Sequence, residues 1–84
     1  MKPIRLSGHA RLRMGQRGAS EAEVAETIRN SLWVAAERGR NECQKDFIFG
    51  RNWNGQVYAS KRIRPIFVEN PQEILVVTVY VYYY

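Results

Sequence analysis

The chain has 84 residues, of which 45% are apolar and 12% aromatic, and it carries a formal net charge of +5. A chain of this length forms one domain with a small core, residues 1–84, and its apolar content predicts a folded protein and not a disordered one. The excess of basic residues favours an anionic partner, with nucleic acid ahead of an acidic protein or a membrane surface.

The first predicted element is a short helix over residues 7–18, which is entered at a serine and left at a glycine. His9, Arg13 and Arg17 recur at intervals of four and therefore lie on one face of this helix. An alanine and a methionine form the adjoining apolar stripe, which packs the helix on a core and leaves the histidine and arginines near the surface. This arrangement suits the binding of an anion.

The charges on this helix face suggest acid–base chemistry. His9 lies near a helix N-terminus and beside guanidinium groups, which disfavours its protonated form and leaves a neutral imidazole able to act as a general base. Arg13 and Arg17 offer planar donors that match phosphate oxygens and stabilise charge on a phosphoryl group in transfer. The alternative is structural, with the histidine capping the helix and the arginines forming a solvated face.

A second helix is predicted from a capping box at Ser20, in which Glu23 reaches back to the N-cap. Val24, Ile28 and Leu32 then recur every four residues and form an apolar stripe suited to packing on a sheet. The acidic residues near its start suit the positive end of the helix dipole. We interpret this helix as a structural element.

The hydrophobic period changes to two after the second helix, which predicts strands. Asn54 and Gly55 provide a two-residue hairpin turn, and another turn lies at Asn70 and Pro71. Pro65 cannot donate to a strand ladder, so we expect the chain to be bent, bulged or on a sheet edge there. The predicted strands are residues 33–37, 45–49, 56–60, 66–69 and 73–82, with a turn at residues 38–41.

The last predicted strand has two distinct faces, one in the core and one that ends in hydroxyl groups. On the second face, Thr78 and Tyr80 would project beside the first helix and help to hold a phosphate or a sugar. Alternatively, threonine and tyrosine occur here only because they form strands well. The predicted core residues of this strand are Leu75, Val77, Val79 and Val81.

A second basic cluster combines Lys61, Arg62 and Arg64 with Arg51 and Trp53 near the preceding hairpin. Cations interleaved with aromatic rings suit RNA, because the cations contact phosphates and the rings stack on unpaired bases. The same charges also occur on ordinary sheet edges, where they prevent edge-to-edge pairing. RNA binding and edge protection are therefore alternative interpretations of this cluster.

The cysteine and histidine content limits the chemistry. Cys43 is the only cysteine and His9 the only histidine, so an intrachain disulfide is impossible and the usual zinc ligand sets cannot be completed. We therefore expect no metal, no cofactor and an inert thiol. The first residues lack the apolar run of a signal peptide, and no hydrophobic stretch is long enough to cross a bilayer, which predicts a cytoplasmic protein.

Two short motifs match a known family. They are His-Ala, Arg-Met and Arg-Gly at residues 9–10, 13–14 and 17–18, and Thr-Val-Tyr at residues 78–80. The chain thereby resembles a small bacterial family known as domain of unknown function 4258, whose signature is His-Ala-x-x-Arg-Met-x-x-Arg-Gly-Ile. Ala19 replaces the isoleucine, which affects packing between the helices more than chemistry. The resemblance spans residues 7–80.

This resemblance implies a function. The family looks related to the barnase, colicin and RelE-like group of metal-independent ribonucleases, many of which are toxins paired with an antitoxin or immunity protein. In such a mechanism a base takes the ribose 2′-hydroxyl proton, arginines stabilise the transition state and an acid protonates the leaving oxygen. His9 is the candidate base or acid, and no second acid or base is evident. The supporting candidates are Arg13, Arg17, Thr78, Tyr80 and Lys61.

We expect an α+β fold in which two N-terminal helices pack on a four-stranded antiparallel sheet, as in RelE-like proteins. The leading function is a metal-independent endoribonuclease of toxin type that acts on RNA. The alternative is a non-catalytic module that binds RNA or protein through the same basic surface. A third interpretation is an inactive relative that forms a homodimer through the C-terminal strand and buries the tyrosines at residues 82–84.

Overall fold

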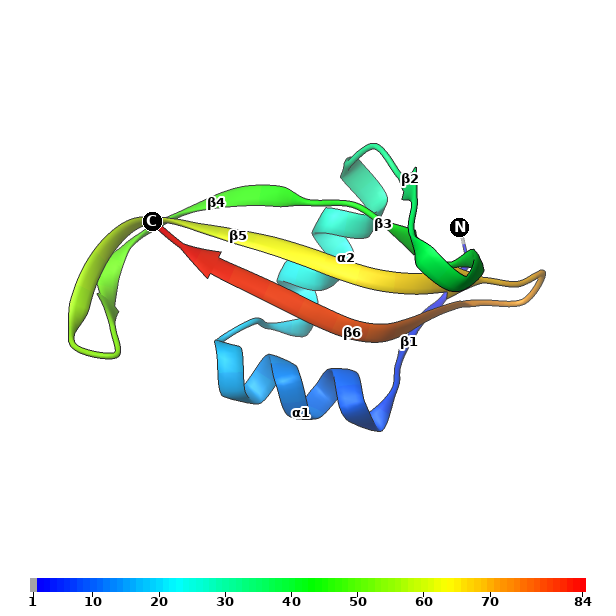
Figure 1. Cartoon of the computed structure of the whole chain (residues 1–84), viewed down its shortest axis with the longest axis horizontal. Helices are drawn as coiled ribbons and strands as arrows, with labels where there is room; N and C mark the ends of the chain where they lie inside the picture. Colours follow the sequence, from blue (N-terminus) through cyan, green and yellow to red (C-terminus); the bar gives the residue numbers. More distant parts are fainter. Residues whose placement is uncertain (1) are drawn as a thin grey trace.

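The computed structural model describes residues 2–84, which form two helices packed on one sheet (Figure 1). The α+β class expected from the sequence is confirmed. The helices are α1 (Gly8–Arg17) and α2 (Glu21–Asn30). The strands are β1 (Ile4–Leu6), β2 (Val34–Ala35), β3 (Asn41–Glu42), β4 (Lys45–Trp53), β5 (Gln56–Glu69) and β6 (Ile74–Tyr83), and η1 (Glu37–Gly39) connects β2 to β3.

The sheet has six strands and is mixed, whereas the sequence led us to expect four antiparallel strands. Its order is β1-β6-β5-β3-β2, and β4 pairs with β5 along the same edge as β3. The added parallel strand is β1, which pairs with β6 through Ile4 opposite Ile74. Strands of two or three residues are too short to show an alternating pattern, so β1, β2 and β3 leave little trace in the sequence.

Both helices begin at the predicted capping residues, and α1 also ends at the predicted glycine. The Ser7 hydroxyl accepts a hydrogen bond from the Ala10 amide at 3.0 Å, and Gly18 ends α1 with a φ of 80°. Ser20 and Glu23 form the predicted capping box at the start of α2. Within residues 2–84, no helix has the length and apolar character needed to cross a membrane.

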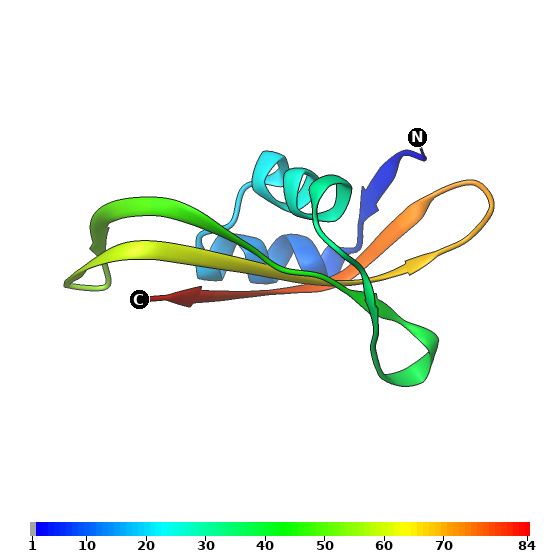
Figure 2. The ribbon, with the colours of Figure 1, turned by 90° about the horizontal axis from the view of Figure 1, so that it is seen from above.

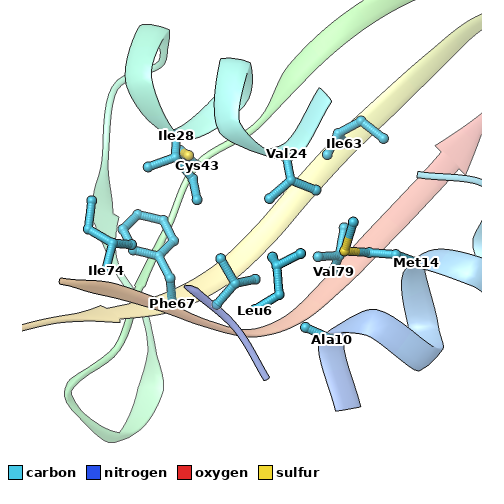
Figure 3. Close-up of a cluster of buried hydrophobic side chains, with 11 residues drawn as sticks. Leu6, Ala10, Met14, Val24, Ile28, Cys43, Ile63, Phe67, Ile74 and Val79 are labelled. Atoms are coloured by element: carbon cyan, nitrogen blue, oxygen red, sulfur yellow. The ribbon is translucent and has the colours of Figure 1, made fainter. Parts of the chain in front are cut away.

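The core lies between the helices and one face of the sheet. Figure 2 shows both helices on the same side of the sheet, and Figure 3 shows the buried side chains that fill the space between them. Ala10 and Met14 of α1 and Val24 and Ile28 of α2 belong to this core. Leu32 was expected to continue the stripe of α2 but is 87% exposed, because the helix ends two residues earlier. Within residues 2–84, neither α1 nor α2 lies on the opposite face of the sheet.

A bulge in β6 changes which of its residues face the core. Ile66 pairs with Thr78 and Phe67 pairs with Val76, so Val77 is an extra residue that shifts the alternation. The strand pattern in the sequence assumed an unbroken alternation, and it therefore failed for the first half of β6. The core-facing residues are Ile74, Val76, Val79 and Val81, in place of the predicted Leu75, Val77, Val79 and Val81.

β5 runs unbroken through Pro65, so the expected break between the strands at residues 56–60 and 66–69 is wrong, whereas the expected unpaired edge is found locally beside the proline. β4 pairs with β5 as far as Ile63, and β3 pairs with it from Ile66, which leaves a gap beside the proline. The carbonyl of Val79, the partner of Pro65 in β6, points away from β5 and accepts from Arg17. Pro65 therefore sits at a non-hydrogen-bonded pair, and its nitrogen faces the gap, where no donor is needed.

Candidate functional site

The hairpin of β2, η1 and β3 is the main irregular feature of the sheet. The Ala36 amide donates to the Arg40 carbonyl at 2.8 Å, and the Arg40 amide donates to the Glu37 carbonyl at 3.2 Å. Arg38 and Gly39, between them, have positive φ angles of 60° and 71°. η1 is therefore a type I′ hairpin turn. The strand predicted at residues 33–37 is shortened to β2, because the chain begins to turn here.

A groove lies between this hairpin and the sheet. Figure 2 shows the hairpin projecting on the side of the sheet opposite the helices. The groove between it and strands β5 and β6 has a volume of about 680 Å³, and we call it the arginine groove. Its charged and hydroxyl-bearing lining residues are Glu37, Arg38, Arg40, Glu42, Arg64, Thr78 and Tyr80.

Arg64 is held rigidly in the arginine groove. Its Nε and Nη2 donate to one oxygen of Glu42 at 3.0 and 2.7 Å, and its Nη1 donates to the Tyr82 hydroxyl at 3.0 Å. The hydrogen bonds to Glu42 raise the pKa of Arg64, although partial burial opposes this effect. Arg64 is therefore a permanent cation whose plane is fixed before a ligand arrives.

Tyr80 is contacted by two guanidinium groups, one from each flank of β6. Arg64, in the neighbouring strand, lies 5.3 Å from the ring centroid, and Arg17, at the end of α1, lies 5.1 Å from it. Arg17 also donates to the Val79 carbonyl at 2.8 Å on the open edge of β6. These contacts bring positive charge from α1 around the sheet edge to the arginine groove.

Three arginines at or beside the groove have no acidic partner. Within residues 2–84, seven of the thirteen lysine and arginine side chains make ion pairs, and Arg17, Arg38 and Arg40 are among the six that do not. Glu37 is the only aspartate or glutamate in the same range that stays outside these pairs. An anion that enters the groove meets cations that are not already neutralised, next to a free carboxylate.

The structure separates His9 and Arg13 from this groove. His9 is exposed in the first turn of α1, and Arg13 donates to Gln16 at 3.0 Å. The helical rise places His9 roughly 12 Å along the axis from Arg17. The predicted row on one helix face exists, but only Arg17 reaches the residues that surround the groove.

Thr78 and Tyr80 line the groove together, but on the side of the sheet that faces away from α1. They pair with Ile66 and Arg64 of β5. α1 packs on the same face as Val79, so the side chains that alternate with it must point the other way. The expectation that they project beside the first helix therefore holds only for Tyr80, whose ring is reached by the Arg17 side chain at the end of α1.

The second basic cluster is divided between the two faces of the sheet, because successive residues of β5 point to opposite sides. Arg62 and Arg64 lie on the helix-free face, where Arg62 pairs with Asp46 at 2.7 Å. Lys61 points toward the helices. The five residues predicted to bind RNA therefore do not form one surface.

Lys61 is a buried structural cation, so its predicted contact with RNA is wrong. The residue is 4% exposed, and its Nζ donates to the Gly18 carbonyl at 2.9 Å and lies 2.8 Å from a Glu23 oxygen. Burial alone would raise the pKa of Glu23, but hydrogen bonds from Lys61 and Ser20 bring that pKa below its ordinary value. The ion pair ties β5 to the junction between the two helices.

Arg51 and Trp53 lie in the β4–β5 hairpin, at the end of the sheet away from the arginine groove (Figure 1). Trp53 stacks on Tyr83 with 4.9 Å between ring centroids, and the Tyr83 hydroxyl donates to the Arg17 carbonyl at 2.7 Å. Arg51 lies over the Phe49 ring at 4.7 Å. These contacts make the aromatic residues a support for the end of α1.

Four charged groove residues, Glu37, Arg38, Arg40 and Glu42, escaped the sequence analysis. Type I′ turns favour Asn-Gly or Asp-Gly, and the arginine at the first central position hides the hairpin. The one signal in the sequence that could have revealed this hairpin was Gly39, which lies between two charged residues in a predicted turn. A bulky residue at positive φ is uncommon, and such strain often accompanies a functional site.

Cys43 is buried, and this burial, with a contribution from Glu42, raises the pKa of its thiol to about 11. The thiol is therefore protonated and unreactive at neutral pH. Within residues 2–84, no group of three or more histidine, cysteine, aspartate or glutamate side chains is placed to hold a metal ion.

The profile of one protein family matches most of the chain. The family is described as domain of unknown function (DUF4258), and the match covers residues 6–81. It includes both helices and every residue that lines the arginine groove. No curated protein and no solved structure shows a significant match.

Proposed function

This chain belongs to the DUF4258 family, and we propose that it is a metal-independent endoribonuclease of toxin type whose active site is the arginine groove. The observation that carries the proposal is the convergence of guanidinium groups there. Arg38, Arg40 and Arg64 line the groove, and Arg17 contacts the Tyr80 ring from the edge of the sheet. Planar cations suit the charge that develops on a phosphodiester during transfer, and within residues 2–84 three of these four, Arg17, Arg38 and Arg40, have no acidic partner.

The groove offers a base and an acid for attack by the ribose 2′-hydroxyl. Glu37 takes the 2′-hydroxyl proton, and the 2′-oxygen bonds to phosphorus as the bond from phosphorus to the 5′-oxygen breaks. Tyr80 gives its proton to the departing 5′-oxygen, and the proton held by Glu37 then returns through water to the tyrosine, which restores both groups. The products are a 2′,3′-cyclic phosphate and a free 5′-hydroxyl. Arg38 and Arg40 stabilise the negative charge on the phosphoryl oxygens.

The same arginines support metal independence. A groove rimmed by guanidinium groups repels a divalent cation and already supplies the positive charge that such a cation would bring. We extend the proposal to the fold and the partner. The antiparallel pairing of β4, β5 and β6 beneath two helices is compatible with a RelE-like toxin, and an antitoxin that covers the groove would carry acidic residues.

The test is cleavage of an RNA oligonucleotide in excess chelator, with the product ends identified. We expect cyclic phosphate ends, no cleavage of the same sequence with 2′-O-methyl groups, and a loss of about a hundredfold in rate for Glu37→Gln. Glu21→Gln, an exposed carboxylate of α2, is the matched control and keeps full activity. Cleavage of the 2′-O-methyl strand, or full activity of Glu37→Gln, contradicts the mechanism.

The position of His9 favours a second candidate, a module that binds RNA without cleaving it. The only histidine of the chain lies outside the groove, which leaves a single free carboxylate as the base. A binding module would show affinity for RNA that falls steeply with salt and no cleavage in the assay above.

A further inference from the structure

A row of tyrosines extends from the arginine groove along the helix-free face. Tyr80 and Tyr82 of β6 and Tyr84, the residue that follows the strand, occupy alternate positions, and they are 38%, 43% and 52% exposed. The Tyr84 amide and carbonyl pair with Ser60 at 3.1 and 2.8 Å, which keeps Tyr84 in register. Alternate residues of a strand lie about 6.6 Å apart on one face, so the rings are evenly spaced.

Two arginines of β5 fix this row from the side. Arg64 donates to the Tyr82 hydroxyl at 3.0 Å, and Arg62 lies over the Tyr84 ring at 5.4 Å. Arg62 is itself held by two hydrogen bonds to Asp46, at 2.7 and 3.2 Å. Within residues 2–84, the Tyr82 ring has no stacking or cation–π partner. The rings are positioned, and Tyr82 is free to receive a planar ligand.

We propose that Tyr82 and Tyr84 form a stacking platform for single-stranded RNA, which enters the arginine groove from this side. Bases that follow the cleaved phosphate stack on the two rings, and the guanidinium planes of Arg62 and Arg64 border the same path. Tyr80 is not part of the platform, because guanidinium groups contact its ring from both flanks of β6, whereas Tyr84 has one such contact, from Arg62. The inference rests on the proposed function in one respect, the assignment of the groove to a phosphodiester.

Single-stranded RNA fits this surface better than duplex RNA or a protein. Bases expose their faces for stacking only when they are unpaired, whereas a duplex presents phosphates and groove edges. The face is also too polar for an apolar protein interface, since both arginines on it are charged and the tyrosine hydroxyls accept hydrogen bonds. Arg38 and Arg40, which have no acidic partner within residues 2–84, lie at the groove end, where a phosphate chain would be anchored.

The experiment is fluorescence anisotropy with a labelled 2′-O-methyl RNA of about ten nucleotides, alone and annealed to its complement. The 2′-O-methyl groups block 2′-hydroxyl attack, so binding is measured separately from cleavage. The decisive variant is Tyr82→Leu/Tyr84→Leu, which removes both rings. Tyr82→Phe/Tyr84→Phe keeps the rings and loses the hydroxyls, and Leu12→Ala removes an exposed side chain of α1 on the other side of the sheet. Circular dichroism checks that each variant is folded.

We expect the single strand to bind at least tenfold more tightly than the duplex. The leucine variant weakens single-strand binding by about tenfold for each ring, and the phenylalanine variant and Leu12→Ala bind as the wild type does. The slope of affinity against salt concentration stays unchanged in the leucine variant, because no phosphate contact is lost.

Two results overturn the platform. One is equal affinity for single strand and duplex with no effect of the leucine variant, which would leave the cleavage proposal standing. The other is a wild-type dimer that dissociates in the leucine variant and does not bind RNA, which would assign the tyrosine row to self-association. Conversely, tyrosine-dependent binding of a single strand by a protein that cleaves no RNA would keep the platform and remove the nuclease.

Discussion

Arg38 occupies a position that costs stability and serves the arginine groove, so replacing it should separate the two properties. Its φ of 60° and ψ of 34° lie in the left-handed region, which costs an L-residue about 1 kcal/mol or more. The side chain is exposed and makes no ion pair or side-chain hydrogen bond within residues 2–84, so its removal breaks no contact that stabilises the fold. Asparagine tolerates this backbone conformation and is favoured in type I′ turns.

We therefore expect Arg38→Asn to raise the free energy of unfolding by about 1 kcal/mol, which corresponds to about 5 °C in Tm for a domain of this size. The same change should weaken RNA binding and lower the salt slope by about 0.7, the value for one phosphate contact to a single strand. Arg40→Gln, with an ordinary φ of −89°, is the matched control. It should lose the same RNA affinity without gaining stability.

Urea unfolding and anisotropy on the same preparations measure both properties. A destabilised Arg38→Asn protein would refute the assignment of strain to this turn. Unchanged RNA affinity and salt slope in both variants would refute the placement of phosphate in the groove.

Other predictions concern the supports of the fold. Lys61→Met should lower the free energy of unfolding, measured by urea unfolding, by about 3 kcal/mol, because it leaves the partly buried Glu23 carboxylate without its cation. The pKa of Glu23 lies below its ordinary value of 4.5, so the stability that its ionised form contributes is present above that pH and is lost as the pH falls below it. Glu23→Gln should therefore lose less stability on acidification than the wild type does. Gly18→Ala should cost at least about 2 kcal/mol by thermal unfolding, because the glycine has a φ of 80° and a Cβ would lie 2.5 Å from the Tyr83 hydroxyl. Cys43 should react with a thiol reagent only at the rate of unfolding, and rapid modification of the native protein would contradict its burial.

The local features of the fold could be predicted from the sequence because neighbouring residues determine them. Ser7 caps the start of α1 by a hydrogen bond within one turn, and Gly18 ends the helix through its positive φ angle. Ser20 caps the start of α2 as Ser7 caps α1. Asn54 and Gly55 form the predicted hairpin with φ angles of 51° and 86°. Each of these signals needs no knowledge of the rest of the chain.

The features that depend on distant residues could not be predicted. The bulge at Val77 appears only when β6 is aligned with β5, and it moves the core from one set of alternate residues to the other. Lys61 is buried because Glu23 and Gly18, far away in the sequence, meet it beneath the helices. Its charge alone suggested a surface role.

Only part of the candidate site could be predicted, because the rest depends on contacts between residues that are distant in the sequence. Arg17, Thr78 and Tyr80 are in or beside the groove, but His9 is not, because a helical row of charges extends over two turns and only its end meets the sheet edge. The hairpin that completes the groove is recognisable only after Arg38 is seen at positive φ.

The most direct test of the account compares RNA cleavage in excess chelator by the wild type, by Arg38→Asn/Arg40→Gln and by His9→Ala, each checked for native fold. We expect the groove variant to lose about a hundredfold or more in rate, since each removed cation weakens the stabilisation of the transition state. His9→Ala should cleave as the wild type does. Full activity in the groove variant together with loss of activity in His9→Ala would place the active site on the exposed face of α1 and contradict the account.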